Sequence, residues 1–137
     1  MKFLLDTNVV AELRKGKRAN AGVRSWFAAV DPDDIRLSVL TIGEIRRGIE
    51  NVRRRDPAAA AALERWLTRL VKDHADGLLP IDGPVAEEWG RLSVPNPWPV
   101  IDGLLAATAH VHGLTLVTRN VRDVVKTGVD VLNPFER

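Results

Sequence analysis

The chain has 137 residues, enough for one domain with a single buried core and too few for two ordinary domains. It contains no cysteine, which excludes disulfides and thiolate metal sites and points to an intracellular, cytoplasmic protein. No apolar run is long enough for a membrane span, and the first one is interrupted at Asp6, too early for a signal peptide. We therefore expect one domain over residues 1–137, with no membrane partner.

Apolar strand-like runs alternate with helical patterns along the chain, and this alternation predicts βαβ units with a parallel sheet. Short runs rich in Leu, Ile and Val predict strands at about residues 3–5, 35–40, 78–81, 114–117 and 129–132. Apolar stripes of helical period, with caps such as Asn8 and Asp56, predict helices at about residues 8–15, 21–30, 41–53, 57–74, 84–92, 101–112 and 121–127. The expected fold is an α/β three-layer sandwich, with helices on both faces of a mainly parallel, about five-stranded sheet.

Four carboxylates stand where a strand-like run gives way to a helix, or at the opening of a helix: Asp6, Glu44, Asp102 and Asp123. The carboxyl ends of parallel strands form one rim of a sheet, where open α/β folds place their ligands, so we expect these side chains to lie close together. At ~5 Å and an effective dielectric of ~20, each pair of like charges costs about 3 kcal/mol. Four acids on one rim therefore need a cation, and oxygen ligands of this kind suit Mg²⁺ or Mn²⁺.

Each acid also has an ordinary structural interpretation. Asp6 and Asp123 could cap or support helix starts. Glu44 follows Thr41 by three residues, the spacing of a capping box, in which the glutamate returns to the backbone of the cap residue. Capping explains Asp102 least well, because it is a charge at the mouth of an otherwise apolar helix. The metal-site hypothesis therefore rests on all four acids sharing one rim.

Four short motifs carry a family resemblance and occur in order, FLLDTN at residues 3–8, TIGEI at 41–45, IDGLLAATA at 101–109 and LVTRNVRD at 116–123. With them the chain resembles PIN domains, specifically VapC-type toxin ribonucleases, over nearly its whole length. The resemblance implies that Asp6, Glu44, Asp102 and Asp123 are the catalytic, metal-binding residues, supported by Thr118 and Asn120. It also implies an antitoxin partner and a homodimer. Val124 stands where the family usually has an aromatic residue, a departure that we expect to affect packing more than chemistry.

The inventory of acids suits hydrolysis of a phosphodiester. A metal ion held by carboxylates lowers the pKa of a coordinated water, orients it and neutralises charge on the departing oxygen, so no protein nucleophile is required. One ion or two are both open, because four acids can fill one site or share two. The resemblance implies RNA as the substrate, cut within the strand. Arginines close in sequence to the acids could hold flanking phosphates or be plain solvated charges: Arg46, Arg47, Arg119 and Arg122.

Without the four acids, 14 acidic residues face 20 basic ones, and this surplus of six positive charges suits a polyanion. A second possible function, a catalytically silent PIN-fold module that binds protein or RNA, is disfavoured because all four acids are present. A third, a receiver-type protein that becomes phosphorylated, requires a paired acid beside Asp6 and a lysine near residues 118–120, and the sequence has neither.

Two apolar features could serve either function or packing. Helix faces at Val9-Val10 with Leu13, and at Val23 with Trp26-Phe27, could form a dimer interface or part of the core. Trp98 lies in a loop with three prolines beside Asp102, and it could stack on a nucleic-acid base or pack inside the protein.

Overall fold

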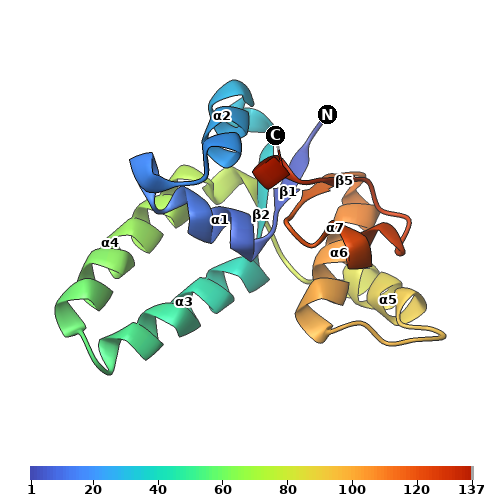
Figure 1. The fold of residues 1–137 in the computed structure, drawn as a ribbon. Helices are drawn as coiled ribbons and strands as arrows, with labels where there is room; N and C mark the ends of the chain where they lie inside the picture. Colours follow the sequence, from blue (N-terminus) through green and yellow to red (C-terminus); the bar gives the residue numbers. More distant parts are fainter. Residues whose placement is uncertain (137) are drawn as a thin grey trace.

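The computed structural model describes residues 1–136, and its centre is a sheet of five parallel strands (Figure 1). The strands are β1 (Phe3–Leu5), β2 (Ile35–Ser38), β3 (Leu78–Leu79), β4 (Thr115–Val117) and β5 (Val131–Leu132). Their order is β3-β2-β1-β4-β5, so β1 lies in the middle, paired with β2 on one side and β4 on the other. Every strand falls inside a range expected from the sequence.

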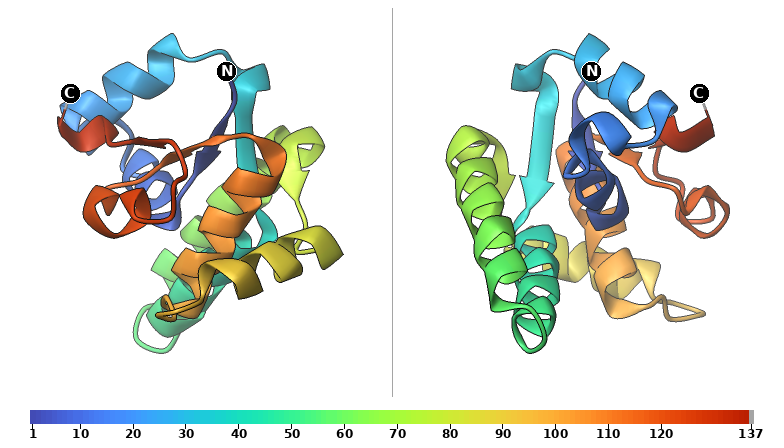
Figure 2. Two further views of the ribbon diagram at one scale, coloured as in Figure 1. Left: turned by 90° about the vertical axis from the view of Figure 1, so that its right-hand side faces the viewer. Right: turned by 60° about the vertical axis from the view of Figure 1, so that its left-hand side comes forward.

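Within residues 1–136, seven α-helices connect the strands and cover both faces of the sheet, which confirms the expected three-layer α/β arrangement (Figure 2). They are α1 (Thr7–Leu13), α2 (Ala21–Ala29), α3 (Val39–Arg53), α4 (Pro57–Asp73), α5 (Gly83–Leu92), α6 (Val100–His112) and α7 (Val121–Val125). Polar caps set several starts: Asp56, for example, accepts a hydrogen bond from the backbone N–H of Ala59. None of these helices is both long and apolar enough to cross a membrane.

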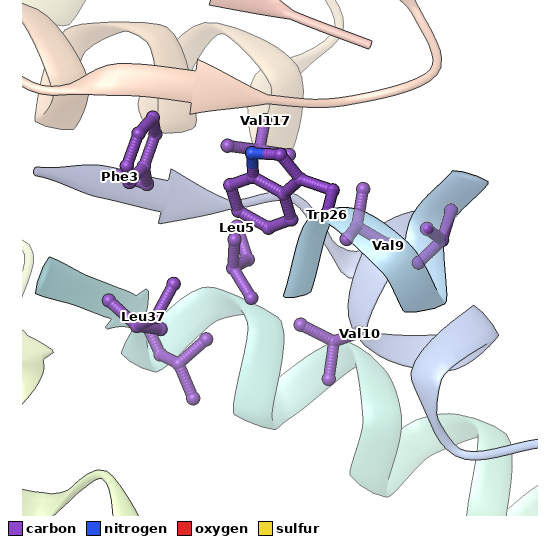
Figure 3. Packing of buried hydrophobic residues seen from close by; sticks show 9 residues of the cluster. Phe3, Leu5, Val9, Val10, Trp26, Leu37 and Val117 are labelled. Atoms are coloured by element: carbon purple, nitrogen blue, oxygen red, sulfur yellow. The ribbon is translucent and has the colours of Figure 1, made fainter. Parts of the chain in front are cut away.

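Neighbouring residues of β1 pack against different helices, because successive side chains of a strand point to opposite faces. Phe3 and Leu5 pack with Val117 on the face covered by α1 and α2, where Trp26 meets the Phe3 ring edge-on at 5.3 Å between centroids (Figure 3). Leu4 faces the other side and belongs to the cluster that includes residues of α6. Full burial of such a side chain contributes roughly 1.5–3 kcal/mol, so β1 is firmly held on both faces.

The helices α3 and α4 lie side by side and extend away from the sheet (Figures 1 and 2). Between them is a separate small core centred on Ile49, Ala60 and Leu67. The helix pair therefore has packing of its own, and its root lies beside the carboxyl ends of the strands, where β2 leads directly into α3.

The start of α3 differs from the sequence prediction. The helix begins at Val39 instead of Thr41, because Ser38 caps it by accepting a hydrogen bond from the backbone N–H of Leu40. Thr41 is buried inside the helix, so the capping-box interpretation of Glu44 is wrong. The start of α1 also differs from the prediction, because its cap is Asp6 and not Asn8.

The two apolar helix faces considered for a dimer interface belong to the core. Their buried members pack against β1, β2 and β4, and the others lie partly buried against the same cluster, since all of Val9, Val10, Leu13, Val23, Trp26 and Phe27 belong to it. A dimer would therefore have to use a different surface.

Candidate active site

The acidic rim lies where the chain changes direction across the sheet. From β1 the chain moves to β2 and β3 on one side, then crosses to β4 and β5 on the other. Open α/β sheets bind ligands at the carboxyl ends of their strands at such a switch point. Asp6 directly follows β1, and its backbone N–H donates to the carbonyl oxygen of Val117, the last residue of β4, at 2.9 Å. Thr118 then follows β4, so two residues 112 positions apart become neighbours.

The carboxylate of Asp6 is buried and held by three donors. The Thr118 hydroxyl donates to Oδ2 at 2.7 Å, and the Asn8 side-chain amide donates to the same oxygen at 3.1 Å. The backbone N–H of Thr7 donates to Oδ1 at 2.6 Å. Burial is the main effect on the pKa of Asp6 and raises it above its usual value, while the hydrogen bond from Thr118 opposes that shift and the charge of Glu44 adds to it.

Glu44 reaches the same region from the second turn of α3. Its Oε1 accepts a hydrogen bond from the Thr7 hydroxyl at 2.5 Å, and the Thr41 hydroxyl lies 3.3 Å from that of Thr7. The start of α1 is thereby tied to α3. Glu44 and Asp6 thus flank Thr7, one bonded to its side chain and the other to its backbone.

Asp102 and Asp123 complete the rim from α6 and α7. Asp102 is half-buried in the first turn of α6, and its pKa is raised first by burial and then by the negative charges of Asp6, Glu44 and Asp123. No hydrogen bond from residues 1–136 contributes to this shift. Asp123 is exposed and lines a cavity of about 190 Å³ together with Asp102. The four acids that are scattered in sequence therefore form one cluster of like charge.

The predicted supporting and RNA-binding residues differ in their contacts and exposure. Asn120 contributes its backbone N–H, which donates to the Thr118 hydroxyl at 3.0 Å. Arg119 stacks on the Phe135 ring, with the guanidinium carbon 3.9 Å from the ring centroid. Arg47 and Arg122 are exposed.

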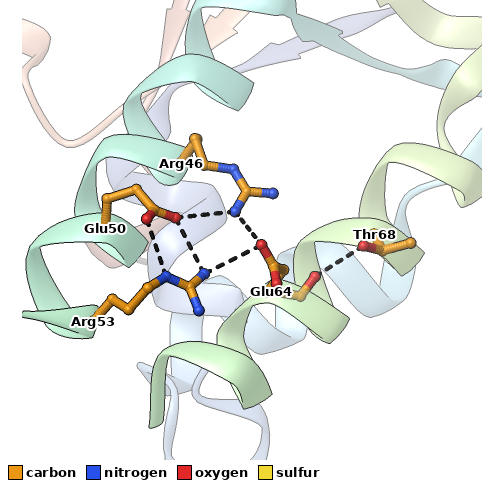
Figure 4. Close-up of polar contacts among 5 residues, drawn as sticks. All are labelled: Arg46, Glu50, Arg53, Glu64 and Thr68. Atoms are coloured by element: carbon orange, nitrogen blue, oxygen red, sulfur yellow. Dashed lines mark hydrogen bonds and ion pairs between the residues drawn. The ribbon is translucent and has the colours of Figure 1, made fainter. Parts of the chain in front are cut away.

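Arg46 is committed to ion pairs between α3 and α4 (Figure 4). Its Nη1 lies 2.5 Å from Glu64 and 3.3 Å from Glu50, and Arg53 pairs with the same two glutamates. These ion pairs occupy the Arg46 guanidinium, so Arg46 is a weaker candidate for binding phosphate than a side chain without such partners.

The donor atoms of the cluster suit a hard divalent cation, because carboxylate oxygens dominate and cysteine is absent from the chain. As the side chains lie, no three acidic or histidine residues among residues 1–136 come close enough to hold one ion directly. Mg²⁺ usually keeps several waters and uses only one or two carboxylates directly, so a partly hydrated ion fits acids with this spacing.

Sequence reasoning did not include Thr7 and Asn8 in the site. The sequence predicts for Asn8 only a cap of the first helix and for Thr7 no particular role, yet their side chains hold Asp6 and Glu44. The signal was present in the sequence, since a run of Asp, Thr and Asn at the end of a buried strand places three polar side chains on the binding rim.

Known proteins resemble this chain in sequence and in fold. The PIN domain family model matches residues 3–127. Toxin FitB of Neisseria gonorrhoeae is 30% identical over 97% of this chain and 98% of its own, and VapC ribonuclease Y4jK of Sinorhizobium fredii is 30% identical over 98% of both. The crystal structure of FitAcB from Neisseria gonorrhoeae superimposes with a TM-score of 0.89 at 29% identity, covering 98% of this chain and 99% of that one.

A more distant structure, a toxin–antitoxin complex from Klebsiella pneumoniae, shares the fold at 23% identity with a TM-score of 0.73, covering 97% of this chain and 98% of that one. The fold, the acidic rim and the family match together define a protein class. The chain belongs to the PIN-domain family, and its relatives include the toxin FitB and a VapC ribonuclease.

Proposed function

We propose that this protein is a Mg²⁺- or Mn²⁺-dependent endoribonuclease and the toxin of a toxin–antitoxin pair. One observation carries the proposal: Asp102 is half-buried among three other carboxylates, and its pKa is raised first by burial and then by their charges. Such a cluster costs free energy in the absence of a cation, because like charges repel one another. A silent binding module would gain nothing from this repulsion. The similarity to a VapC ribonuclease supports the same reaction.

Asp6, Glu44, Asp102 and Asp123 would hold the metal. When bound there, the ion lowers the pKa of a water molecule and neutralises charge on the departing oxygen of the phosphodiester. The residues around them keep the acids in place. Thr118 and Asn8 fix the Asp6 carboxylate from one side, and Thr7 fixes Glu44. The backbone of Asn120 in turn orients the Thr118 hydroxyl.

Exposed basic residues of the chain would position the rest of the RNA. Arg47 is on α3, three residues after Glu44, and Arg122 directly precedes Asp123. Neither forms an ion pair with another side chain of residues 1–136, so both are free to bind phosphates. Arg119 remains a third candidate, through its stacked guanidinium.

The test is a cleavage assay on purified protein with total cellular RNA, in Mg²⁺, in Mn²⁺ and in excess chelator, followed by mapping of new RNA ends. We expect discrete new ends with either metal and none with chelator, because the cluster offers no metal-free catalyst. Full cleavage in chelator, or no cleavage with either metal, would contradict the proposal.

The proposed partner is an antitoxin that covers the acidic rim. A groove of about 270 Å³ between α1, α3 and α4 begins at Thr7 and Glu44 and continues over apolar side chains such as Ile45, Val52 and Trp66. An antitoxin segment with apolar residues fits this groove and can place a basic side chain among the carboxylates. Its affinity should therefore fall as Mg²⁺ is added. Equal affinity of the cognate antitoxin at zero and saturating Mg²⁺ would contradict direct competition.

The assembly that we propose is a cytoplasmic homodimer in which residues 1–137 act as one domain. One sheet and its two flanking cores support the single domain. Light scattering at assay concentration tests the dimer: a mass twice that of the 15.1 kDa chain is expected, and a monomer would contradict it.

A further inference from the structure

A groove extends from the acidic cluster over side chains that the proposed chemistry does not use. The 190 Å³ cavity at Asp102 and Asp123 shares two lining residues, Trp98 and Thr127, with a larger cavity of about 410 Å³. The larger cavity lies between the proline loop, residues 93–99, and the segment after α7, which contributes Lys126. We call the two cavities together the Trp98 groove.

The chemistry of the Trp98 groove changes along its length. Its first end is acidic, with Asp102 and Asp123. Its middle is apolar and aromatic, formed by Trp98 together with Ala106 and Val124. Its far end carries the positive charges of Arg91 and Lys126. A nucleotide within a strand offers matching groups, because its ribose carries an aromatic base and joins two phosphates, one of which can lie at the metal-binding acids and the other near a cation.

The Trp98 side chain is anchored in the groove wall. Its indole N–H donates to the carbonyl oxygen of Leu92, at the end of α5, at 2.7 Å. Its Cβ packs so closely on Gly103 of α6 that a Cβ added there would lie 3.3 Å from it, and 3.1 Å from Trp89. The glycine therefore allows both tryptophans to approach the first turn of α6. Half-buried in this way, the indole is fixed in place before any ligand binds, which reduces the entropy that binding would cost.

Lys126 is free to bind an anion. It is exposed, and it forms no ion pair with any of residues 1–136. Arg91 pairs with Glu88 through Nε, at 2.8 Å, and its side chain is still 67% exposed. Lys126 thus supplies a positive charge without an ion-pair partner among residues 1–136 at this end of the groove, next to a site whose proposed substrate is a polyanion.

We propose that the Trp98 groove binds the nucleotide adjacent to the cleaved phosphate of single-stranded RNA, with its base against Trp98 and its outer phosphate at Lys126. This subsite rests on the proposed nuclease function and makes it more specific. It requires an unpaired nucleotide at that position, because a base held in a duplex cannot reach the indole. Stacking on an aromatic side chain tolerates any base, so the groove selects single strands more than sequences.

The experiment is a double-mutant cycle between protein and RNA. The substrate is a labelled single-stranded RNA with one cut site, prepared intact and with one abasic nucleotide at each position in turn. Wild-type kcat/KM should fall about 5- to 150-fold at one abasic position beside the cut, the range for loss of one base stack. Trp98→Ala should show the same loss on intact RNA and no further loss at that position.

A second cycle pairs Lys126→Ala with RNA carrying one neutral methylphosphonate at each position in turn. The two changes should be non-additive at one phosphate, and the variant should lower the slope of log(kcat/KM) against log salt by about 1. Lys72→Ala is the matched control, because Lys72 is equally exposed but lies on α4, on the opposite side of the sheet from α6 and α7 (Figure 1). It should behave as wild type throughout.

Additive penalties at every position in both cycles would overturn the subsite. If Trp98→Ala does not fold, the cycle of the exposed Lys126 decides alone. A change of oligomeric state in Trp98→Ala with unchanged RNA coupling would show that a second copy of the chain fills the groove, and would also overturn the proposal.

If wild type cuts no RNA with either metal, the nuclease proposal fails instead. The same cycles are then measured as RNA binding by fluorescence anisotropy, and additive losses of affinity would overturn the subsite.

Discussion

On the paired helices α3 and α4, acidic and basic side chains alternate and neutralise one another, whereas at the carboxyl ends of β1 and β4 four acidic side chains stand together. The helix pair joins two glutamates and two arginines through contacts of 2.5 to 3.3 Å, formed by Arg46, Glu50, Arg53 and Glu64 (Figure 4). The rim holds Asp6, Glu44, Asp102 and Asp123 with hydroxyls and amides around them, and no basic side chain among residues 1–136 is bonded to them.

The difference separates charges that support the fold from charges that serve a ligand. Exposed ion pairs such as those on α3 and α4 contribute roughly 0–1 kcal/mol each, and their loss is tolerated. The acids of the rim oppose folding instead, since burial and mutual repulsion raise the pKa of Asp102. A cluster of like charges that destabilises the free protein is expected where a cation binds. Each of the following experiments compares a substitution in the rim with one in the helix pair, or tests one of these regions.

The largest effect is expected for Asp102→Asn. The substitution keeps the size of the side chain and removes its charge, so kcat/KM on RNA should fall at least ~100-fold, the low end for loss of a group essential to metal binding or proton transfer. Glu64→Gln removes a charge of the same sign from the helix pair and should change kcat/KM by less than about twofold, because exposed pairs contribute little. Comparable losses in the two variants would erase the distinction between the regions.

A smaller loss is expected for Thr118→Val. The variant keeps the shape of a fully buried residue but removes the hydroxyl that donates to Asp6 at 2.7 Å, so kcat/KM and Mg²⁺ affinity should fall about 10-fold, the low end for a partner of a metal ligand. Thr68→Val is the control, since the Thr68 hydroxyl bonds to the Glu64 carbonyl oxygen on the exposed side of α4. Wild-type Mg²⁺ affinity in Thr118→Val would remove this residue from the site.

The smallest effect concerns the stability that the helix pair gains from its charges. Glu64→Gln removes the negative charge that pairs with Arg46 and Arg53, and it should lower the free energy of unfolding by at most about 1 kcal/mol. This difference should disappear in 1 M salt, where the screening length falls to about 3 Å. Denaturant unfolding at low and high salt measures it, and a loss that persists at high salt would mean that the pairs are not simple surface contacts.

The fold was largely predictable because its strands and helices are local patterns. Buried runs such as residues 3–5, and the Asp56-Pro57 start of α4, predict the elements that the structure contains. Boundaries failed where two caps compete. Ser38 and Thr41 are both good cap residues. Ser38 is used because the pairing of β2 with β3 ends there, and this pairing cannot be read from the sequence around the cap.

The rim of the sheet was predictable for the acids but only partly for the residues around them. A parallel sheet brings its strand ends together whatever the details, so the gathering of Asp6 with Glu44 and Asp102 follows from topology. The bond from Thr7 to Glu44 and the ion pairs of Arg46 depend on how α1, α3 and α4 pack, and no short sequence pattern encodes that packing. The cavity beside Trp98 was not predictable either, because it depends on how two loops far apart in the sequence lie relative to each other.

The central claim, that the rim is a crowded metal site, is tested most directly by thermal melting of wild type and Asp102→Asn without metal and across a Mg²⁺ titration. Asp102 suits this test better than Asp6, whose three hydrogen bonds an asparagine could not all accept. Without metal, the variant should melt roughly 3 to 8 °C higher, as expected for relief of about 1–2 kcal/mol of repulsion.

Two further trends belong to the same measurement. The difference in melting temperature between wild type and variant should disappear as pH falls through the raised pKa of Asp102, because the protonated Asp102 of wild type no longer carries a negative charge. Mg²⁺ should raise the melting temperature of wild type much more than that of the variant, so that the two curves converge or cross. Equal melting temperatures without metal, together with equal shifts on adding Mg²⁺, would contradict the account and leave the four acids as separate features of their helices.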